Sequence, residues 1–245
     1  MSFVHLHNHT EFSMLDGAAR VGDAVAAAKA DGQPALAITD HGNMYGVLDF
    51  YKACRDAGIT PIIGTEAYMA HETRTERPAR RGRLDDSGGD TEGGRKLYYH
   101  LTLLAQDRAG YRNMIQLASR AFLEGYFYKP RVDWELLDEH SEGLIATTAC
   151  LGGHVLQSLM VGDEAEALAR AGRLQDIFGK ENLFVEIQDH GIDKQRQTMP
   201  GLLEISRKLG APLLATNDSH YVAREDAKAH DALLCVQTNS MMSDP

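Results

Sequence analysis

The stretch Ile38-Thr39-Asp40-His41-Gly42-Asn43 joins an apolar run to a polar turn. Residues 35–39 have the length and the apolar character of a buried β-strand, and Gly42 permits a tight turn directly after it. The turn leaves His41 at the carboxyl end of the predicted strand. Because an ionisable pair is costly in such a buried place unless it has partners, the stretch predicts a functional site.

Residues able to bind a metal recur at the ends of other predicted strands. These residues are His7, His9, Glu66, His100, Cys150, Asp218 and His220. Parallel strands bring their carboxyl ends to one rim, so side chains that are far apart in the sequence can meet there. A set that mixes nitrogen, oxygen and sulfur suits zinc, iron or manganese better than calcium or magnesium. The pattern therefore predicts a polynuclear metal site.

Each of these residues also has an ordinary structural explanation when it is taken alone. A His-x-His pair can be two core or surface histidines, and Glu66 can belong to a structural salt bridge. His100 can be a satisfied core histidine, and Cys150 can be a small apolar packing residue. The metal-site prediction therefore depends on the motifs occurring together.

Short apolar or β-rich runs alternate with helical stretches along the chain. Strands are expected at residues 3–6, 35–39, 61–68, 98–104, 143–148, 183–187 and 212–216. Helices are expected at residues 21–30, 47–57, 111–123, 164–178 and 194–209. This alternation predicts an α/β fold with a mainly parallel sheet. Because the strand ends must converge on one site, a closed barrel is favoured over an open sheet, whose outer strands would lie far apart.

The composition is that of a soluble intracellular domain. With 245 residues, 43% of them apolar, the chain can bury the core of a single domain. Neither a signal peptide nor an apolar run of membrane-spanning length is visible, so we expect a cytoplasmic protein with no membrane partner. The three cysteines, Cys54, Cys150 and Cys235, are odd in number and far apart, which argues against a disulfide framework.

The net charge of −10 is unfavourable for a protein that must bind a polyanion through lysine and arginine alone. Three divalent cations would change this charge from −10 to −4 and would place positive charge at the site itself. The acidic composition thus favours a metal site over a basic nucleic-acid-binding patch.

One segment, residues 71–96, interrupts the alternation of strands and helices. It contains a run rich in glycine and aspartate, preceded by five arginines: Arg74, Arg77, Arg80, Arg81 and Arg83. This composition predicts an exposed, flexible polar loop inserted into the domain. The cluster of arginines leaves open a contact with nucleic acid or with a partner protein.

Taken together, the motifs resemble those of the polymerase and histidinol phosphatase (PHP) family of metal-dependent phosphoesterases, which have His-x-His, Asp-His-Gly, a strand-ending Glu and a final Asp-x-His. More narrowly, the sequence is similar over its whole length to the PHP domains at the amino termini of bacterial replicative DNA polymerase III alpha subunits. The stretches that carry this similarity are residues 4–10, 38–45, 128–133, 140–145, 186–191, 215–221, 225–227 and 230–238.

The resemblance implies a distorted seven-stranded (β/α) TIM-like barrel of PHP type, formed by residues 1–245 as a single domain. It also implies three divalent metal ions, zinc with manganese or iron as alternatives. The metal ligands, which are also the catalytic residues, would be His7, His9, Asp16, His41, Glu66, His100, Cys150, Asp218 and His220. All nine side chains can coordinate a metal. Asp16 enters only through the resemblance, because its surroundings look like an ordinary turn, and His5 would then be structural or would support a ligand.

The complete ligand set implies a 3′→5′ exonuclease that removes mispaired nucleotides, with the cations polarising the phosphate and activating water. Its partners would be the DNA primer 3′ end and the remainder of the bacterial polymerase alpha subunit, to which residues 237–245 would begin the linker. Two alternatives stay open. One is a metal-stabilised structural domain of the polymerase without nuclease activity, and the other is a phosphatase acting on small phosphomonoesters.

Several other polar residues are less decisive. His190 follows the sixth predicted strand and is a candidate for the rim of the site. Lys129 and Arg131 either contact DNA or brace the barrel. The remaining histidines, expected to be structural or exposed, are His71, His140, His154 and His230.

Overall fold

The structure, a computed structural model, describes residues 3–79 and 96–244. Within these residues the strands are β1 (Ala35–Ile38), β2 (Thr60–Met69), β3 (Tyr99–Ala105), β4 (Arg131–Val132), β5 (Leu144–Thr147), β6 (Leu183–Ile187) and β7 (Leu213–Ala215). Their hydrogen-bonded order is β1-β2-β3-β5-β6-β7, and β4 pairs with β2. The chain divides into two compact units, a first unit of residues 1–65 and 217–245 and a second unit of residues 66–216.

In the first unit, helices α1 (Val21–Ala30) and α2 (Val47–Ala57) pack together beside β1. The buried residues of α1, which are two valines and two alanines, are spaced three and four apart and form one apolar face of the helix. Phe50 and Cys54 of α2 are fully buried in the same core, and Gly58 ends the helix in the left-handed conformation. β1 and β2 pair in parallel, with Ile38 opposite Ile63. The predicted helices at residues 21–30 and 47–57 are confirmed.

The strand expected at residues 3–6 is wrong, although this part of the chain is hydrogen-bonded on both sides. On one side, the Ala37 and Thr39 N–H groups donate to the carbonyls of His5 and Asn8. On the other, the His9 N–H donates to the Ser219 carbonyl at 2.8 Å. Asn8 N–H donates to the Thr39 side-chain Oγ1 at 2.8 Å instead of to a backbone carbonyl, which interrupts the regular ladder. The segment therefore takes the place of a strand without forming one.

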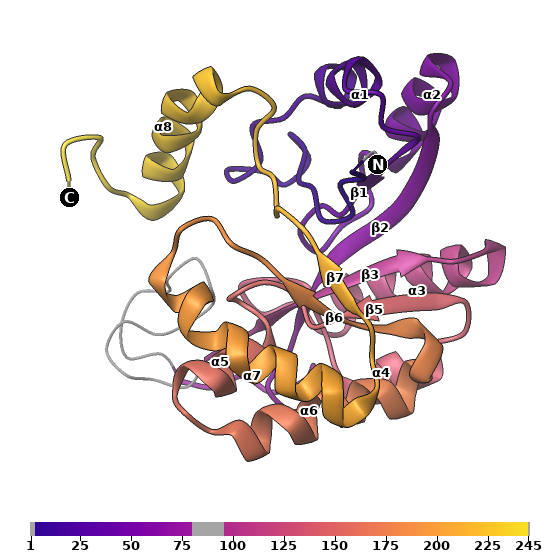
Figure 1. The fold of residues 1–245 in the computed structure, drawn as a ribbon, viewed down its shortest axis with the longest axis vertical. Helices are drawn as coiled ribbons and strands as arrows, with labels where there is room; N and C mark the ends of the chain where they lie inside the picture. Colours follow the sequence, from indigo (N-terminus) through magenta and orange to yellow (C-terminus); the bar gives the residue numbers. More distant parts are fainter. Residues whose placement is uncertain (1–2, 80–95, 245) are drawn as a thin grey trace. The chain divides into compact units, whose positions relative to one another are not determined.

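In the second unit, β5, β6 and β7 are parallel neighbours. The buried carboxylate of Glu186 on β6 accepts hydrogen bonds from Thr147 of β5 and from Thr216, which follows β7. Helices α5 (His154–Met160), α6 (Glu164–Phe178) and α7 (Asp193–Leu209) pack on one another in this unit (Figure 1). The predicted strand at residues 183–187 and helix at residues 164–178 are confirmed.

The parallel arrangement has one exception, which changes how the site is assembled. β3 runs antiparallel to β5, with Leu103 opposite Ala146. His100 is the second residue of β3, so the expectation that it ends a strand is wrong. Because the two strands run in opposite directions, the start of β3 lies beside the end of β5, and His100 forms a bridge with Gly153. Glu66 also lies inside a strand, since β2 continues to Met69.

The arginine-rich segment is only partly an exposed loop. Arg74 is buried, and its guanidinium donates to Asp133 at 2.9 Å and to Glu124 at 2.8 Å. The expectation of an exposed loop is therefore wrong for Arg74, which joins this segment to helices α3 (Arg108–Leu123) and α4 (Trp134–Glu139). Arg77 is exposed, as expected. The remaining three arginines, Arg80, Arg81 and Arg83, lie outside the described residues.

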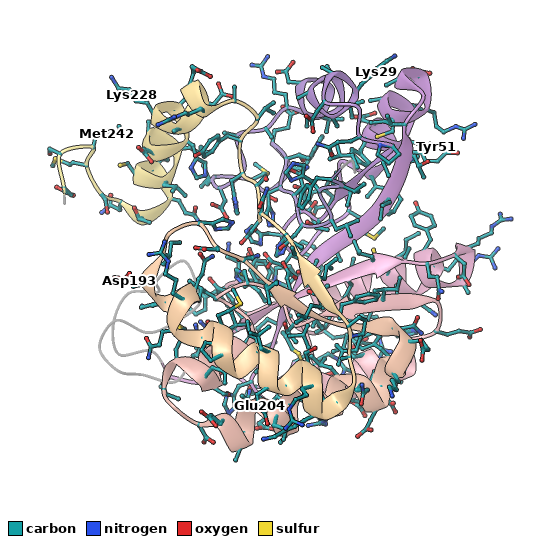
Figure 2. All side chains as sticks on the ribbon, in the orientation of Figure 1. Lys29, Tyr51, Asp193, Glu204, Lys228 and Met242 are labelled. Carbon is teal, nitrogen blue, oxygen red and sulfur yellow. The ribbon has the colours of Figure 1, made fainter. Side chains whose placement is uncertain are left out.

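The end of the chain contains a helix that was not expected, α8 (Ala227–Thr238), preceded by the short 3-10 helix η2 (Arg224–Asp226). Residues 237 and 238, expected to begin a linker, belong to α8. None of its residues is buried, and Figure 2 shows Lys228 and Met242 projecting from this part of the chain. All three cysteines are free, as expected. Among the described helices, none combines the length and the apolar character needed to cross a bilayer.

Candidate metal centre

Six of the predicted ligands come together in the first unit: His7, His9, Asp16, His41, Asp218 and His220. The Nε2 atoms of His7 and His9 lie 3.3 and 3.2 Å from the same oxygen of Asp218, Oδ1. The Nε2 atom of His41 lies 2.7 Å from Oδ2 of Asp16, and that of His220 lies 3.4 Å from this oxygen. Four imidazoles thus converge on two carboxylates, which is a donor set suited to zinc and similar divalent cations.

The ring of His9 links the two halves of this first group. It stacks on the ring of His41, with centroids 4.1 Å apart, and on the ring of His220, with centroids 4.3 Å apart. One ring nitrogen from each of these three histidines lies within 4.8 Å of the others. Such a spacing would allow all three to bind one ion.

A buried hydrogen-bond relay orients His9. Asp40 is 1% exposed and its Oδ1 accepts from the Ser13 hydroxyl at 2.7 Å. The Ser13 oxygen accepts from the His41 backbone N–H at 3.1 Å and lies 2.9 Å from Nδ1 of His9. Because the only serine proton points to Asp40, Nδ1 of His9 carries the proton in this bond. Nε2 of His9 is then left unprotonated on the side of Asp218, as a metal ligand must be.

The electrostatics of the first group keep the carboxylate of Asp16 charged. Burial alone would raise the pKa of Asp16, but the hydrogen bonds with His220 and His41 outweigh it and hold this pKa far below its ordinary value. Burial alone would lower the pKa of His220, but its bond with Asp16 and the negative charge of Asp218 raise it. Cation binding at His220 would therefore release a proton.

The other three predicted ligands come together in the second unit. Nδ1 of His100 lies 3.2 Å from Oε2 of Glu66 and 3.5 Å from the Cys150 sulfur. The same sulfur lies 3.4 Å from Oε1 of Glu66 and accepts from the Gly152 N–H at 3.4 Å. All three side chains are almost completely buried. This second group offers one nitrogen, two oxygens and one sulfur, a set that also suits zinc.

Gly152 is required for the approach of His100. A Cβ atom at this position would lie 2.8 Å from Nδ1 of His100 and 2.9 Å from Cγ. Real Cβ atoms do not come so near to other atoms, so any larger residue would displace the imidazole. The turn after β5 therefore carries a glycine for steric reasons.

Backbone strain is concentrated beside the ligands. Among the described residues, five that are not glycine have positive φ, and Asp218 is one of them with φ 47°. Leu15, with φ 66°, directly precedes Asp16, and Ala149, with φ 59°, directly precedes Cys150. Each such residue costs on the order of 1 kcal/mol or more, and such strain gathers at functional sites. The strained turns point the ligands inward.

Sequence reasoning missed two residues that support the first group, Ser13 and Asp40. Asp40 had a visible signal, since a carboxylate follows an apolar strand in the Asp-His-Gly motif. Ser13 had none, because its role depends on the fold of the turn. His230 was expected to be structural or exposed, and it packs near the first group with its ring 5.7 Å from that of His220.

The other histidines take structural positions in the described chain. His5 is partly buried beside Phe3 and lines a cavity of about 230 Å³. His71 contacts the Tyr99 hydroxyl at 3.0 Å, and His154 is buried against the ring of Tyr99, with centroids 3.7 Å apart. His190, the rim candidate, is exposed, and its ring Nδ1 lies 3.1 Å from the side-chain nitrogen of Gln195.

Comparison with known proteins gives a consistent result. The PHP domain family matches residues 5–190. The DNA polymerase III alpha subunit of Treponema pallidum is 47% identical over 245 residues, which is all of this chain and 20% of that relative. That of Mycobacterium tuberculosis is 48% identical over 247 aligned residues, covering all of this chain and 21% of the relative. The chain thus spans about one fifth of the length of these relatives.

Solved structures share the fold at low sequence identity. A protein from Bifidobacterium adolescentis, assigned as a metal-dependent phosphoesterase, has a TM-score of 0.50 and 17% identity over 89% of this chain and 87% of its own. A two-domain protein from Bacteroides vulgatus that contains a predicted PHP-like metal-dependent phosphoesterase has the same TM-score of 0.50 and 17% identity, over 91% of this chain and 53% of its own. These likenesses confirm the predicted α/β fold of PHP type.

Proposed function

Because this chain belongs to the PHP domain family, we propose that it is the 3′→5′ exonuclease domain of a bacterial replicative DNA polymerase III alpha subunit. In this role it hydrolyses DNA phosphodiester bonds at a mispaired primer 3′ end. The observation that supports the proposal is the convergence of four imidazoles on the carboxylates of Asp16 and Asp218. A domain that binds no metal has no need for so complete a ligand set.

Three divalent metal ions are proposed for the centre, zinc first and manganese or iron as alternatives. The residues that would hold them are His7, His9, Asp16, His41, Glu66, His100, Cys150, Asp218 and His220. Bound there, the ions would supply Lewis-acid polarisation of the phosphate and a lowered pKa for water. The Cys150 sulfur accepts from the Gly152 N–H, a bond that orients it beside Glu66 and His100.

The covalent chain connects the two groups of proposed ligands over a short stretch of sequence. The Thr65 hydroxyl donates to the backbone carbonyls of Asp40 and Asn43 at 2.9 and 3.0 Å, within the first unit. Asp40 is the neighbour of His41, and Glu66 is the neighbour of Thr65. A ligand of the second group is thus one peptide bond away from a residue anchored beside the first group.

The proposed partners are the DNA primer 3′ end and the rest of the polymerase chain, in the bacterial cytoplasm. The net charge of −10 gives this chain little affinity of its own for DNA. The proposal therefore assigns most of the duplex binding to the remainder of the polymerase. This chain would act on the single-stranded end delivered to it.

Degradation of DNA with a mispaired or single-stranded 3′ end tests the proposal. The metal-loaded protein should shorten such a strand from its 3′ end, and Asp218→Asn should reduce the rate by at least 100-fold, since Asp218 contacts two histidines. Asp23→Asn is the matched control, because Asp23 is exposed on α1 and should leave the rate unchanged. Unchanged turnover by the Asp218→Asn protein would refute the assignment.

A metal-stabilised structural role is a second candidate, favoured by the complete burial of His7 and His9. Buried ligands are brought together only in the folded protein, so a metal binds the folded state and not the unfolded chain. Metal binding therefore stabilises the fold. A metal present at 100 times its dissociation constant would add about 2.7 kcal/mol to the free energy of unfolding. Chelation should then lower the melting temperature by roughly 5–10 °C for a chain of this size. A metal-dependent melting temperature without nuclease activity would favour this candidate alone.

A further inference from the structure

The loop before β4 contains a tyrosine with a strained backbone, and this strain is not explained by a neighbouring predicted ligand. Tyr128 has φ 63°, and the Phe127 N–H donates to the Lys129 carbonyl at 3.0 Å around it. Of the five described non-glycine residues with positive φ, three are a predicted ligand or precede one, and Asn239 is the ordinary left-handed cap of α8. Tyr128 is the one left, and its side chain is 46% exposed. The strained position of this loop thus carries an aromatic ring at the surface.

A buried arginine holds this loop in place. The Arg131 side chain is 0% exposed and donates to four backbone carbonyls, those of Gly125 at 3.1 Å, Leu97 at 3.4 Å, Arg74 at 3.0 Å and Glu76 at 2.7 Å. Its cation cannot reach a ligand in solvent. Of the two roles left open by the sequence, Arg131 therefore braces the fold.

Lys129, in contrast, is only partly buried and lies two residues before β4. Parallel pairing places Arg131 of β4 opposite Tyr68 of β2. The ammonium group of Lys129 lies over the ring of the same Tyr68. The chain approaching β4 thus brings a lysine beside a residue that is two positions from Glu66 on β2.

Two aromatic contacts set an upper limit on the distance from Lys129 to the ligand His100. Nζ of Lys129 lies 5.1 Å from the centre of the Tyr68 ring, which in turn meets the His100 ring edge-on at 5.6 Å. Laid end to end, these spacings place the ammonium group no more than 10.7 Å from the centre of the His100 ring. This is the length of about three nucleotides of a stacked strand, at about 3.4 Å each.

We propose that Tyr128 and Lys129 form a subsite for single-stranded DNA within about three nucleotides of the bond that is cut. Lys129 pairs with a backbone phosphate, and Tyr128 stacks on a base of the same strand. The subsite rests on the proposed function, because it takes the strand whose 3′ end enters the centre. Stacking on an aromatic face and pairing with phosphate carry no sequence information, so the subsite selects an unpaired strand and not a base.

The affinity for a short single-stranded DNA tests the subsite. Phosphorothioate linkages at the 3′ end of this DNA prevent its cleavage during the measurement. The variants are Lys129→Gln, with Lys129→Arg as its charge-preserving partner, and Tyr128→Gly, with Tyr128→Phe as its ring-preserving partner. Glycine suits the positive φ of Tyr128 and therefore removes the ring without adding strain. Lys194→Gln and Tyr111→Ala are matched controls, because both residues are exposed in the same unit.

Lys129→Gln should weaken binding and reduce the slope of log K against log salt by about 0.7, the loss of one phosphate contact on a single strand. Tyr128→Gly should weaken binding roughly fivefold to hundredfold, the range for one stacked base. The arginine and phenylalanine variants should restore most of the affinity. In turnover, KM for DNA should rise while the rate on bis(p-nitrophenyl) phosphate and the bound metal stay unchanged.

The possible failures are separable. If Lys129→Gln and Tyr128→Gly bind DNA as the two controls do, the subsite is wrong, whatever the activity of the centre. If both variants lose bound metal along with DNA affinity, and the arginine and phenylalanine variants do not restore it, the residues are structural and the subsite is also wrong. If the unaltered protein binds the strand through Lys129 and Tyr128 but cleaves neither DNA nor the small diester, the subsite stands and the proposed nuclease function fails.

Discussion

Replacement of Gly152 by alanine should displace His100 and weaken metal binding without unfolding the protein. The added Cβ would lie 2.8 Å from Nδ1 of His100, whereas ordinary contacts begin at 3.4 Å. The imidazole must therefore move by about half an ångström, because the β-carbon belongs to a rigid turn. Metal–ligand distances tolerate only about 0.2 Å. The displacement is thus more than twice what a bound ion can accept.

The expected loss in metal affinity is about 10- to 100-fold, the range found when a group that positions a ligand is altered. A competition titration of zinc against a chromophoric chelator measures this loss directly. The metal-free protein should lose about 1–3 kcal/mol of unfolding free energy from overpacking, which thermal melting after chelation would show. Both effects arise from the same contact with His100.

Gly172→Ala is the matched control for this experiment. Nothing lies within 4 Å of a Cβ added at Gly172, which is inside helix α6. Alanine there should leave zinc binding unchanged and add about 1 kcal/mol to the free energy of unfolding through its greater helix propensity. A Gly152→Ala protein that binds zinc with the stoichiometry and affinity of the unaltered chain would refute the steric argument.

Three further changes test other parts of the structure. Ser13→Ala should lower zinc affinity about 10- to 100-fold, because Nδ1 of His9 loses its acceptor. Ser119→Ala, at an exposed serine of α3, should leave zinc affinity unchanged, and equal zinc titrations for both variants would contradict the relay. Arg131→Met should lower the free energy of unfolding by about 2–5 kcal/mol, because four backbone carbonyls lose their donor. Denaturant titration measures this loss, and an unchanged unfolding midpoint would exclude the bracing role. Burial, followed by the charge of Arg170, lowers the pKa of His154 well below its ordinary value. The imidazole of the unfolded chain therefore binds a proton more readily than that of the folded protein, and the folded protein loses stability as pH falls below about 6.5. The metal-free His154→Phe protein should therefore lose less stability between pH 6.5 and pH 5 than the unaltered chain, and parallel stability curves would show that His154 is not the titrating group.

The strands and long helices could be predicted because their local patterns agree with the fold. Residues 183–187 are apolar and bounded by turn residues, and they form a strand with those limits. The direction of β3 could not be predicted in this way, because an apolar run has the same pattern in either direction. The two-residue strand β4 was missed for a related reason, since so short a segment has no periodicity. The direction of β3 and the formation of β4 are both decided by pairing with strands that are distant in the sequence.

The candidate site was predictable where a ligand carries an unusual local signal. His41 and Asp218 each follow an apolar run, and a charged residue there is conspicuous. Asp16 has no such signal, because it lies in an ordinary turn and its partners, His41 and His220, are far away in the sequence. Family resemblance supplied Asp16, and the structure places it 2.7 Å from His41.

The antiparallel step between β3 and β5 has a chemical consequence. In a wholly parallel sheet, the two neighbours would both contribute residues from their carboxyl ends, and these would usually lie in loops. Here His100 lies on β3 itself, near its start, and its N–H donates at 3.1 Å to the Gly152 carbonyl in the turn that follows β5. A ligand on a strand moves less than one on a loop. The reversal therefore gives the second group a rigid nitrogen donor, around which the strained turn at Ala149 brings the sulfur of Cys150 to 3.5 Å.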